Sequence, residues 1–277
     1  MGPAEVQSLL DTHMLGPNRA LGQNFVTDPL VIEAIVAAAG VRPGSRVLEV
    51  GPGLGSLTLG LLEAGAEVLA VEKDPALAEV LREVLEIRGH TGVRVECSDA
   101  LEVSWADLLA VDGWKMVSNL PYNVAVPIVL DLLRRAPMVK ELWVMVQLEV
   151  AQRLCARPGG RTIGVPTVKA AWYSRSRIVM EIPPEAFTPV PKVTSAVVEM
   201  KRCDPPRHDV DAAAVFDLIE VAYRKRRKML RSSLEGRLGS GAFDTAGSIR
   251  RRAPRSCPWS TGRTWPRCRV VLPHEHR

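Results

Sequence analysis

The chain has 277 residues, of which 47% are hydrophobic and 24% charged, and it carries a net charge of +5. Such a chain can bury a full core and add a smaller second domain, and no apolar run reaches the roughly 18 residues needed to span a membrane. The first 30 residues lack a secretory signal pattern, and the five cysteines are odd in number, far apart and without a Cys-x-x-Cys pair, so we expect a cytoplasmic protein without disulfides.

The first predicted elements are helices. One is expected at the extreme amino end. A second is better signalled, because Asp28 suits an N-cap, Pro29 the first turn and Gly40 a stop, with apolar spacing through Ile35.

Short apolar runs then alternate with helical stretches. The expected strands are Arg46–Val50, Glu67–Val71, Val93–Cys97, Trp114–Val117 and Leu142–Val146, and the expected helices include Pro75–Ile87 and Val124–Arg135. This alternation predicts a parallel sheet with helices on both faces. Two later β-rich runs, Arg177–Glu181 and Ser195–Met200, have no full helix between them and are expected at an antiparallel edge of the same sheet.

A change in composition near Cys203-Asp204-Pro205-Pro206 predicts a boundary between a first domain, residues 1–203, and a second, residues 204–277. Helical spacing predicts one or two packed helices from Asp211 to about Leu238. Beyond Tyr223 there are 15 Lys/Arg against 3 Asp/Glu, which favours a polyanion partner, because cations that neutralise phosphates gain from counterion release. A solvated charged face is the alternative.

A glycine-rich turn, Gly51-Pro52-Gly53-Leu54-Gly55, follows the first parallel strand and predicts a nucleotide-cofactor site, because glycine lets the backbone turn tightly and a ligand approach it. Glu72 ends the next strand, where a carboxylate can accept hydrogen bonds from both hydroxyls of a ribose. NAD enzymes use the same device, so these two features leave the cofactor open. Asp99 ends the third strand and is placed to accept a hydrogen bond from an adenine amine, although an isolated Asp there is more often a helix cap.

The sharpest signal is Asn119-Leu120-Pro121-Tyr122-Asn123, directly after the fourth strand. An exocyclic base amine is a poor nucleophile, and acceptors aimed at its two N–H groups help to localise its lone pair. The Asn119 side-chain carbonyl and the Leu120 backbone carbonyl suit this role, because Pro121 stiffens the loop and extends the residue before it. Tyr122 can stack on the base. Alone, the motif would read as a turn with a half-buried Tyr.

Taken together, the chain resembles the adenine N6,N6-dimethyltransferases of small-subunit (16S) ribosomal RNA, the kasugamycin-sensitivity methyltransferase family. The resemblance runs from about Gly16 to Phe243. It rests on Leu21–Phe25, Glu49–Gly55, Asn119–Asn123, Phe187–Val197 and Arg226–Leu234. It implies a Rossmann-like class I sheet that binds S-adenosyl-L-methionine, with a small C-terminal helical domain. It also implies dimethylation of two adjacent adenines near the 3′ end of the 16S rRNA during ribosome biogenesis, by a monomer that binds the small ribosomal subunit.

The resemblance also implies roles for matched positions. Asn24 and Val26 would close over the methionine end of the cofactor, Glu72 would hold the ribose, and Asn119 would face both the methyl group and the target amine. Tyr122 and Phe187 would sandwich a flipped adenine, since a stacked base cannot be reached in line. The remaining expected contacts are Gly51, Gly53, Asp99 and Ala100 for the cofactor, Leu120 and Pro121 for the reaction, and Arg224, Lys225, Arg226, Arg227, Lys228 and Arg231 for RNA.

The family pattern is lost from about residue 248, where an Arg, Pro and Trp mixture begins. We interpret this tail as a shifted-frame translation or, alternatively, as a disordered basic arm that binds RNA. Its Cys257, Cys268, His274 and His276 match no common zinc spacing, so no metal is expected.

Three other functions are possible at this point. One is a macrolide-resistance-type adenine methyltransferase of 23S rRNA, and another is a non-enzymatic ribosome-assembly factor on the same scaffold. An NAD dehydrogenase is disfavoured, because no His or Tyr-x-x-x-Lys proton donor accompanies the glycine turn.

Overall fold

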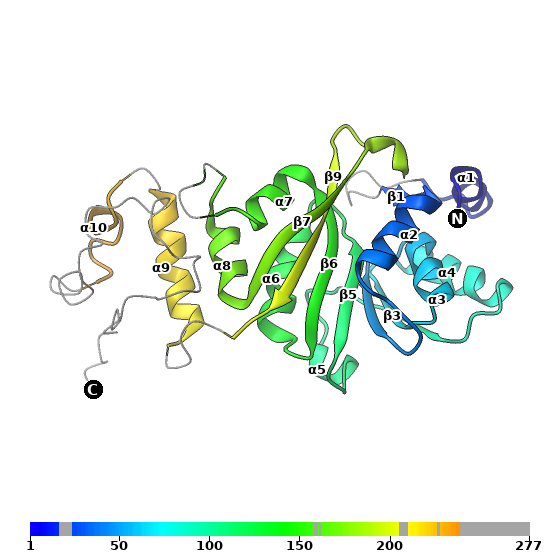
Figure 1. Cartoon of the computed structure of the whole chain (residues 1–277), viewed down its shortest axis with the longest axis horizontal. Helices are drawn as coiled ribbons and strands as arrows, with labels where there is room; N and C mark the ends of the chain where they lie inside the picture. The colour runs from blue at the N-terminus through cyan, green and yellow to red at the C-terminus, as the bar shows by residue number, and fades with distance from the viewer. Residues whose placement is uncertain (17–23, 158–159, 161, 205–209, 226–227, 239–277) are drawn as a thin grey trace. The chain divides into compact units, whose positions relative to one another are not determined.

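The computed structural model describes residues 1–16, 24–157, 160, 162–204, 210–225 and 228–238, which form two compact units (Figure 1). The first unit comprises residues 1–151 and 175–202, and the second comprises residues 152–174 and the chain from 203 onward. The division between residues 202 and 203 lies next to the predicted domain boundary, which was placed after residue 203. Residues 152–174, however, were expected in the first domain and group with the second unit instead.

The helices are α1 (Pro3–Thr12), α2 (Pro29–Ala38), α3 (Ser56–Glu63), α4 (Pro75–Ile87), α5 (Trp105–Leu108), α6 (Ala125–Arg135), α7 (Leu148–Leu154), α8 (Val165–Tyr173), α9 (Ala212–Arg224) and α10 (Leu230–Ser233). The strands are β1 (Phe25–Val26), β2 (Arg46–Val50), β3 (Glu67–Glu72), β4 (Val93–Cys97), β5 (Trp114–Asn119), β6 (Val139–Gln147), β7 (Ser174–Ile182), β8 (Phe187–Thr188) and β9 (Ser195–Arg202). None of the described helices is both long and apolar enough to cross a membrane.

The main sheet of the first unit has seven strands in the order β4-β3-β2-β5-β6-β9-β7. The strands from β4 to β6 are parallel, and β9 runs antiparallel to β6. The predicted α/β class is therefore confirmed, as is the position of the two late strands at one end of the sheet (Figure 1). A separate pair, β1 and β8, was not predicted and joins residues 25–26 to residues 187–188.

Local chemistry explains where two of the helices begin. The Asp28 carboxylate accepts a hydrogen bond from the Leu30 N–H at the start of α2, and Asp74 accepts one from the Ala76 N–H at the start of α4. A proline occupies the first turn of each helix, where its missing N–H costs nothing. Both starts agree with the sequence prediction for α2 and α4.

The backbone pairing of β2 with β5 stops before the carboxyl ends of the two strands. Their register joins Val47 to Lys115 and Leu48 to Met116, whereas the Val50 N–H donates to the Ser118 hydroxyl at 2.9 Å instead of to a backbone carbonyl. The chain continues from β2 toward one end of the sheet and from β5 toward the other. Such a switch point opens a crevice at the carboxyl ends of the strands, where ligands bind in sheets of this kind.

The second unit is built around α8 and α9. Val168 and Trp172 of α8 pack against Phe216 and Ile219 of α9, and the Trp172 and Phe216 rings meet edge to face at 5.7 Å. This shared apolar cluster explains why residues 152–174 group with the chain beyond residue 203. The predicted helical segment from Asp211 onward contains α9 and α10.

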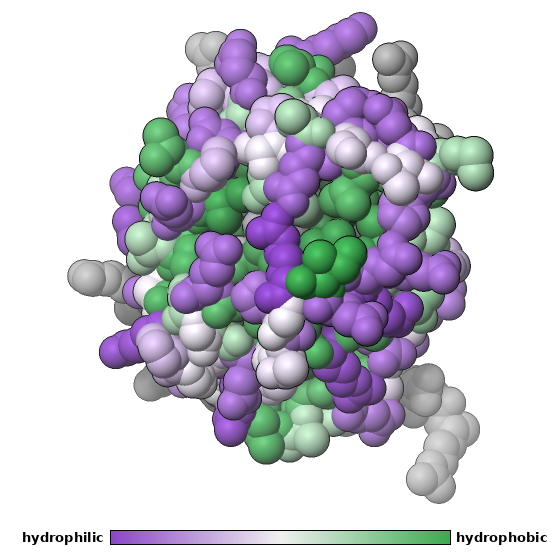
Figure 2. Space-filling view, turned by 90° about the vertical axis from the view of Figure 1, so that its right-hand side faces the viewer, coloured by the Kyte–Doolittle hydropathy of each residue, from purple (hydrophilic) through white to green (hydrophobic). Residues whose placement is uncertain are grey.

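The face of the molecule on the side of α1 and α4 mixes apolar and polar side chains, with hydrophobic residues gathered around its centre (Figure 2). Single apolar side chains such as Leu30 and Ile87 are exposed in the first unit. Isolated exposure of this kind is ordinary for a folded domain.

Candidate active site

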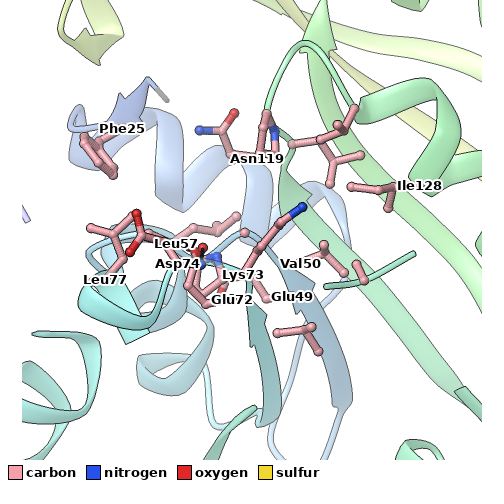
Figure 3. A pocket seen from close by; sticks show the side chains of 18 of the residues that line it. Phe25, Glu49, Val50, Leu57, Glu72, Lys73, Asp74, Leu77, Asn119 and Ile128 are labelled. Carbon is pink, nitrogen blue, oxygen red and sulfur yellow. Dashed lines mark hydrogen bonds between the residues drawn. The ribbon is translucent and has the colours of Figure 1, made fainter. Parts of the chain in front are cut away.

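A pocket lies at the carboxyl ends of β2, β3 and β5, in the crevice that the switch point opens (Figure 3). The segment after β4 and the short strand β1 complete its lining. The lining includes all of the residues predicted to bind the cofactor, Asn24, Val26, Gly51, Gly53, Glu72, Asp99, Ala100 and Asn119, and also Leu120, Pro121 and Tyr122. The structure therefore brings together residues that are up to 98 positions apart in the chain, from Asn24 to Tyr122.

The glycine turn is closely packed against other parts of the pocket. Gly51 and Gly53 have φ angles of +70° and +57°, in the left-handed region that glycine adopts at little cost. A Cβ atom on Gly51 would lie 3.2 Å from Cδ of Pro121, and one on Gly53 would lie 2.7 Å from the Phe25 ring. Both the backbone conformation and the lack of space therefore require glycine at these positions.

Glu72 is nine-tenths buried, and its carboxylate is held in place by the backbone. One oxygen accepts from the Gly53 N–H at 3.1 Å and the other from the Asp74 N–H at 2.9 Å. Burial raises the pKa of Glu72, and the two backbone N–H groups oppose that rise. Each oxygen retains acceptor capacity, so the carboxylate is fixed in a position to accept hydrogen bonds from a diol.

Glu49 also lines the pocket, and the sequence analysis gave it no role of its own. Its side chain is 1% exposed, and the Thr58 hydroxyl donates to it at 2.7 Å. Burial and, to a smaller extent, the nearby Glu72 charge raise the pKa of Glu49 to about 8 against the opposing effect of Thr58. Glu49 could have been recognised from the sequence by its position, because it lies two residues before Gly51 on a strand that is buried on both faces.

Asp99 forms an ion pair with Lys73 at 2.7 Å and accepts a hydrogen bond from the Leu101 N–H at 2.9 Å. The Lys73 ammonium and the Leu101 N–H lower the pKa of Asp99, so this carboxylate is ionised and acts as an acceptor. Sequence analysis missed Lys73, which directly follows Glu72 and lines the same pocket.

Asn119 carries an unsatisfied acceptor. Its Nδ2 donates to the backbone carbonyl of Asn24 at 2.8 Å, which orients the amide. Its Oδ1 is buried and has no hydrogen-bond partner within the described part of the chain. In the view of Figure 3 this amide lies across the pocket from Glu72. A buried acceptor left unpaired is costly, which indicates that a ligand N–H completes it.

The neighbours of Asn119 fix the rest of the loop. The Leu120 N–H donates to the Met145 carbonyl at 3.1 Å, and the Tyr122 hydroxyl lies 2.8 Å from that of Ser195. Burial raises the pKa of Tyr122, so the phenol remains neutral near pH 7.

Ser56, at the start of α3, also lines the pocket, and its buried hydroxyl has no partner among the described residues. It was not anticipated from the sequence.

Phe187 is not among the residues that line the pocket, and its stacking on a base stays a prediction. Its side chain is 1% exposed and belongs to the apolar core of the first unit. The reason is the pairing of β8 with β1, which sets Phe187 opposite Val26. In this structure Phe187 pairs with β1, which lines the pocket together with the preceding Asn24.

The predicted RNA-binding residues lie in the second unit, apart from the pocket lining. Arg224, Lys225, Lys228 and Arg231 are exposed, whereas Arg226 and Arg227 fall outside the described residues. The four described cations have no acidic partner in the described part of the chain. The tail from residue 248, with Cys257, Cys268, His274 and His276, also falls outside it. No metal-holding group of three or more His, Cys, Asp or Glu occurs among the described residues.

The sheet order, the switch-point pocket and the glycine turn define a class I methyltransferase fold. Two solved structures share it. A dimethyladenosine transferase from Plasmodium falciparum superposes with a TM-score of 0.65 at 22% identity, covering 76% of this chain and 74% of that one. The 23S rRNA methyltransferase ErmE superposes with a TM-score of 0.60 at 27% identity, covering 85% and 96% of the two chains.

The chain belongs to the ribosomal RNA adenine dimethylase family, whose model matches residues 15–251. Its curated relatives include the ribosomal RNA small subunit methyltransferase A of Kineococcus radiotolerans, 46% identical over 86% of this chain and 79% of the relative. The protein of the same name from Nocardia farcinica is 46% identical over 87% and 84%. The family match ends close to residue 248, where the sequence analysis placed the loss of pattern.

Proposed function

We propose that this protein transfers methyl groups from S-adenosylmethionine to the N6 amine of adenine in small-subunit ribosomal RNA. Family membership supports the class of reaction, and the relatives named ribosomal RNA small subunit methyltransferase A support the substrate. The observation that carries the proposal is the buried, unpaired Oδ1 of Asn119 in the pocket.

The residues of the pocket fit S-adenosylmethionine. The backbone of the turn at Gly51 and Gly53 lines the pocket, Glu72 presents fixed acceptors for the ribose hydroxyls, and the ionised Asp99 can accept from the adenine amine. When bound, this cofactor supplies a methyl group on a sulfonium, which is already an activated leaving group. The protein is therefore required to orient the reactants more than to provide acid or base catalysis.

Asn119 and Leu120 would accept hydrogen bonds from the two N–H groups of the target amine. These contacts draw the lone pair of the nitrogen out of the aromatic ring and point it toward the methyl group. Tyr122 would hold the flipped base by stacking on its face. Its neutral phenol is suited to this role, because a buried phenolate would repel the RNA.

We further propose, from the resemblance described in the sequence analysis, that the target is two adjacent adenines of 16S rRNA, each methylated twice, within an assembling small subunit in the cytoplasm. The exposed cations Arg224, Lys225, Lys228 and Arg231 would contact phosphates around that site, together with Arg226 and Arg227. We expect the protein to act as a monomer.

A substitution of Asn119 tests the proposal. Asn119→Ala removes the unpaired acceptor, and we expect methyl transfer from labelled S-adenosylmethionine to unmodified small subunits to fall by about a hundredfold or more. Thermal unfolding and calorimetric binding of S-adenosylhomocysteine would show that the fold and the pocket survive. Nucleoside analysis would identify dimethyladenosine as the product of the unaltered protein.

Two results would contradict the proposal. Unimpaired methylation by Asn119→Ala would remove the catalytic assignment. Large subunits assayed in parallel provide the second control, because incorporation into them alone would favour the 23S rRNA alternative, to which ErmE belongs by its name.

A further inference from the structure

Ser195 connects the pocket to the antiparallel end of the sheet. It is the first residue of β9, is completely buried, and pairs in register with Gln147 of β6. The neighbouring Thr194 carbonyl accepts from the Leu148 N–H at 2.9 Å, so the backbone on both sides of Ser195 is held. Its hydroxyl lies 2.8 Å from the Tyr122 hydroxyl. Ser195 therefore offers the Tyr122 ring a fixed anchor.

This contact matters because of where it is made. A tyrosine ring is oriented by two side-chain torsions, and a hydrogen bond at its far end restrains both of them. Tyr122 lies in the loop after β5, whereas Ser195 lies in a strand that is paired with β6 from Ser195 to Lys201. The hydrogen bond therefore restrains the Tyr122 ring, which lines the pocket, relative to the paired strands of the sheet.

The two methyl transfers to one amine need different amounts of help from that ring. Before the first transfer the amine has two N–H groups, which the Asn119 and Leu120 oxygens can both accept. After it only one N–H remains, so one of the two hydrogen bonds is lost and the added methyl group must also be accommodated. The stacked ring then carries a larger share of the positioning in the second transfer.

We propose that Ser195 is a positioning residue that holds the Tyr122 ring against the target adenine, and that the second methylation depends on it more than the first. This inference rests on the proposed function, because it concerns the product ratio of that reaction. It assigns Ser195 no contact with the substrate or cofactor, since it acts through Tyr122.

Ser195→Ala tests this role by removing only the hydroxyl. In a single-enzyme time course on unmodified small subunits, we expect the first methylation to proceed within about twofold of the normal rate and the second to slow about three- to tenfold. Monomethyladenosine would accumulate, and the dissociation constant of S-adenosylhomocysteine would stay unchanged. Ser174→Ala is the matched control, because Ser174 is also buried and hydrogen-bonded, but its partner, the Ala170 carbonyl at 2.9 Å, does not belong to a residue that lines the pocket, whereas the partner of Ser195 does.

Tyr122→Phe removes the same hydrogen bond from the other side and keeps the ring, so the test stands even if Ser195→Ala folds poorly. We expect the same shift toward monomethyladenosine, and the double variant should be no worse than either single one. Normal ratios of monomethyladenosine to dimethyladenosine in both single variants would overturn the positioning role of Ser195 while leaving the proposed function intact. Equal slowing of both transfers would show that the hydroxyl is merely structural. If the unaltered protein forms no methyladenosine on small subunits, both the proposed function and the positioning role of Ser195 are refuted.

Discussion

Glu49 shows how strongly the pocket alters a single side chain. Folding moves its carboxyl group from water into a site where it is 1% exposed, with one hydrogen bond from Thr58 to compensate. The pKa therefore rises to about 8, so the folded protein retains a proton at Glu49 at pH values where the unfolded chain has lost it. Other charges that line the same pocket are Glu72, Asp74, Asp99 and the Lys73 ammonium.

This difference predicts a pH-dependent stability. A group whose pKa is raised on folding stabilises the protein fully below its unfolded pKa, and this stabilisation is lost as the pH rises toward the folded pKa. Relative to Glu49→Gln, the protein should lose about 1.4 kcal/mol of unfolding free energy per pH unit between roughly pH 5 and pH 8, with no further change above. Urea unfolding of both proteins from pH 5 to pH 9 measures this, and parallel profiles would show that Glu49 ionises normally.

The predictability of single residues follows from where they lie. Gly51, Glu72, Asp99 and Asn119 could be placed in the pocket because each lies at the end of a parallel strand or within two residues after it, and such ends meet at one edge of a sheet. The inward position of Phe187 could not be predicted, because β8 has two residues and its partner β1 lies about 160 positions away. A strand that short has no periodicity from which a buried face can be read.

At the scale of elements, the pocket depends on how the turn between β2 and α3 meets β1. Gly53 contributes its N–H to Glu72 and lies directly against the Phe25 ring, so the turn, β3 and β1 are held together at one residue. Phe25 itself lines the pocket (Figure 3). A change at Gly53 should therefore affect ligand binding as well as stability.

Gly53→Ala separates these two effects when compared with Gly89→Ala. Both residues have positive φ, +57° and +69°, so either alanine costs about 1 kcal/mol in backbone strain. Only at Gly53 does the new Cβ collide with a neighbour, the Phe25 ring at 2.7 Å, whereas nothing lies within 4 Å at Gly89. Calorimetry should show S-adenosylhomocysteine binding weakened about tenfold or more by Gly53→Ala and unchanged by Gly89→Ala. Equal affinities would mean that the turn adapts to the extra methyl group.

The bounds of the helices and strands were more predictable than which of these elements pack or pair with one another. The sequence patterns located β2, β3, β4 and α4 to within a residue, since each has its own turn and capping signals. They did not show that α8 belongs with α9, because Val168 and Trp172 reveal a buried face without revealing what covers it. The β1–β8 pair was missed for a similar reason, since each strand is too short to be recognised before the other is known.

At the scale of the whole molecule, the charges are unevenly distributed along the chain. Residues 1–223 carry a net charge of −7, whereas the chain from Arg224 onward carries +12. In the described part of that region Arg224, Lys225, Lys228 and Arg231 are exposed. Many cations of the first unit are paired instead, including Arg94 with Glu96, Arg134 with Asp131 and Lys140 with Asp112. Unpaired, exposed cations are the ones that gain most from meeting phosphates.

The combined substitutions Lys225→Gln, Lys228→Gln and Arg231→Gln should weaken RNA binding and reduce its salt dependence. If each cation neutralises one phosphate, the slope of log affinity against log salt should fall by roughly 0.7 to 0.9 per residue. Titration of a labelled 16S rRNA fragment at several salt concentrations measures it. The matched control, Arg94→Gln with Arg134→Gln and Lys140→Gln, lowers the net charge equally but removes cations that are already paired. Similar slopes for the two triple variants would show that net charge, and not this cluster, governs RNA binding.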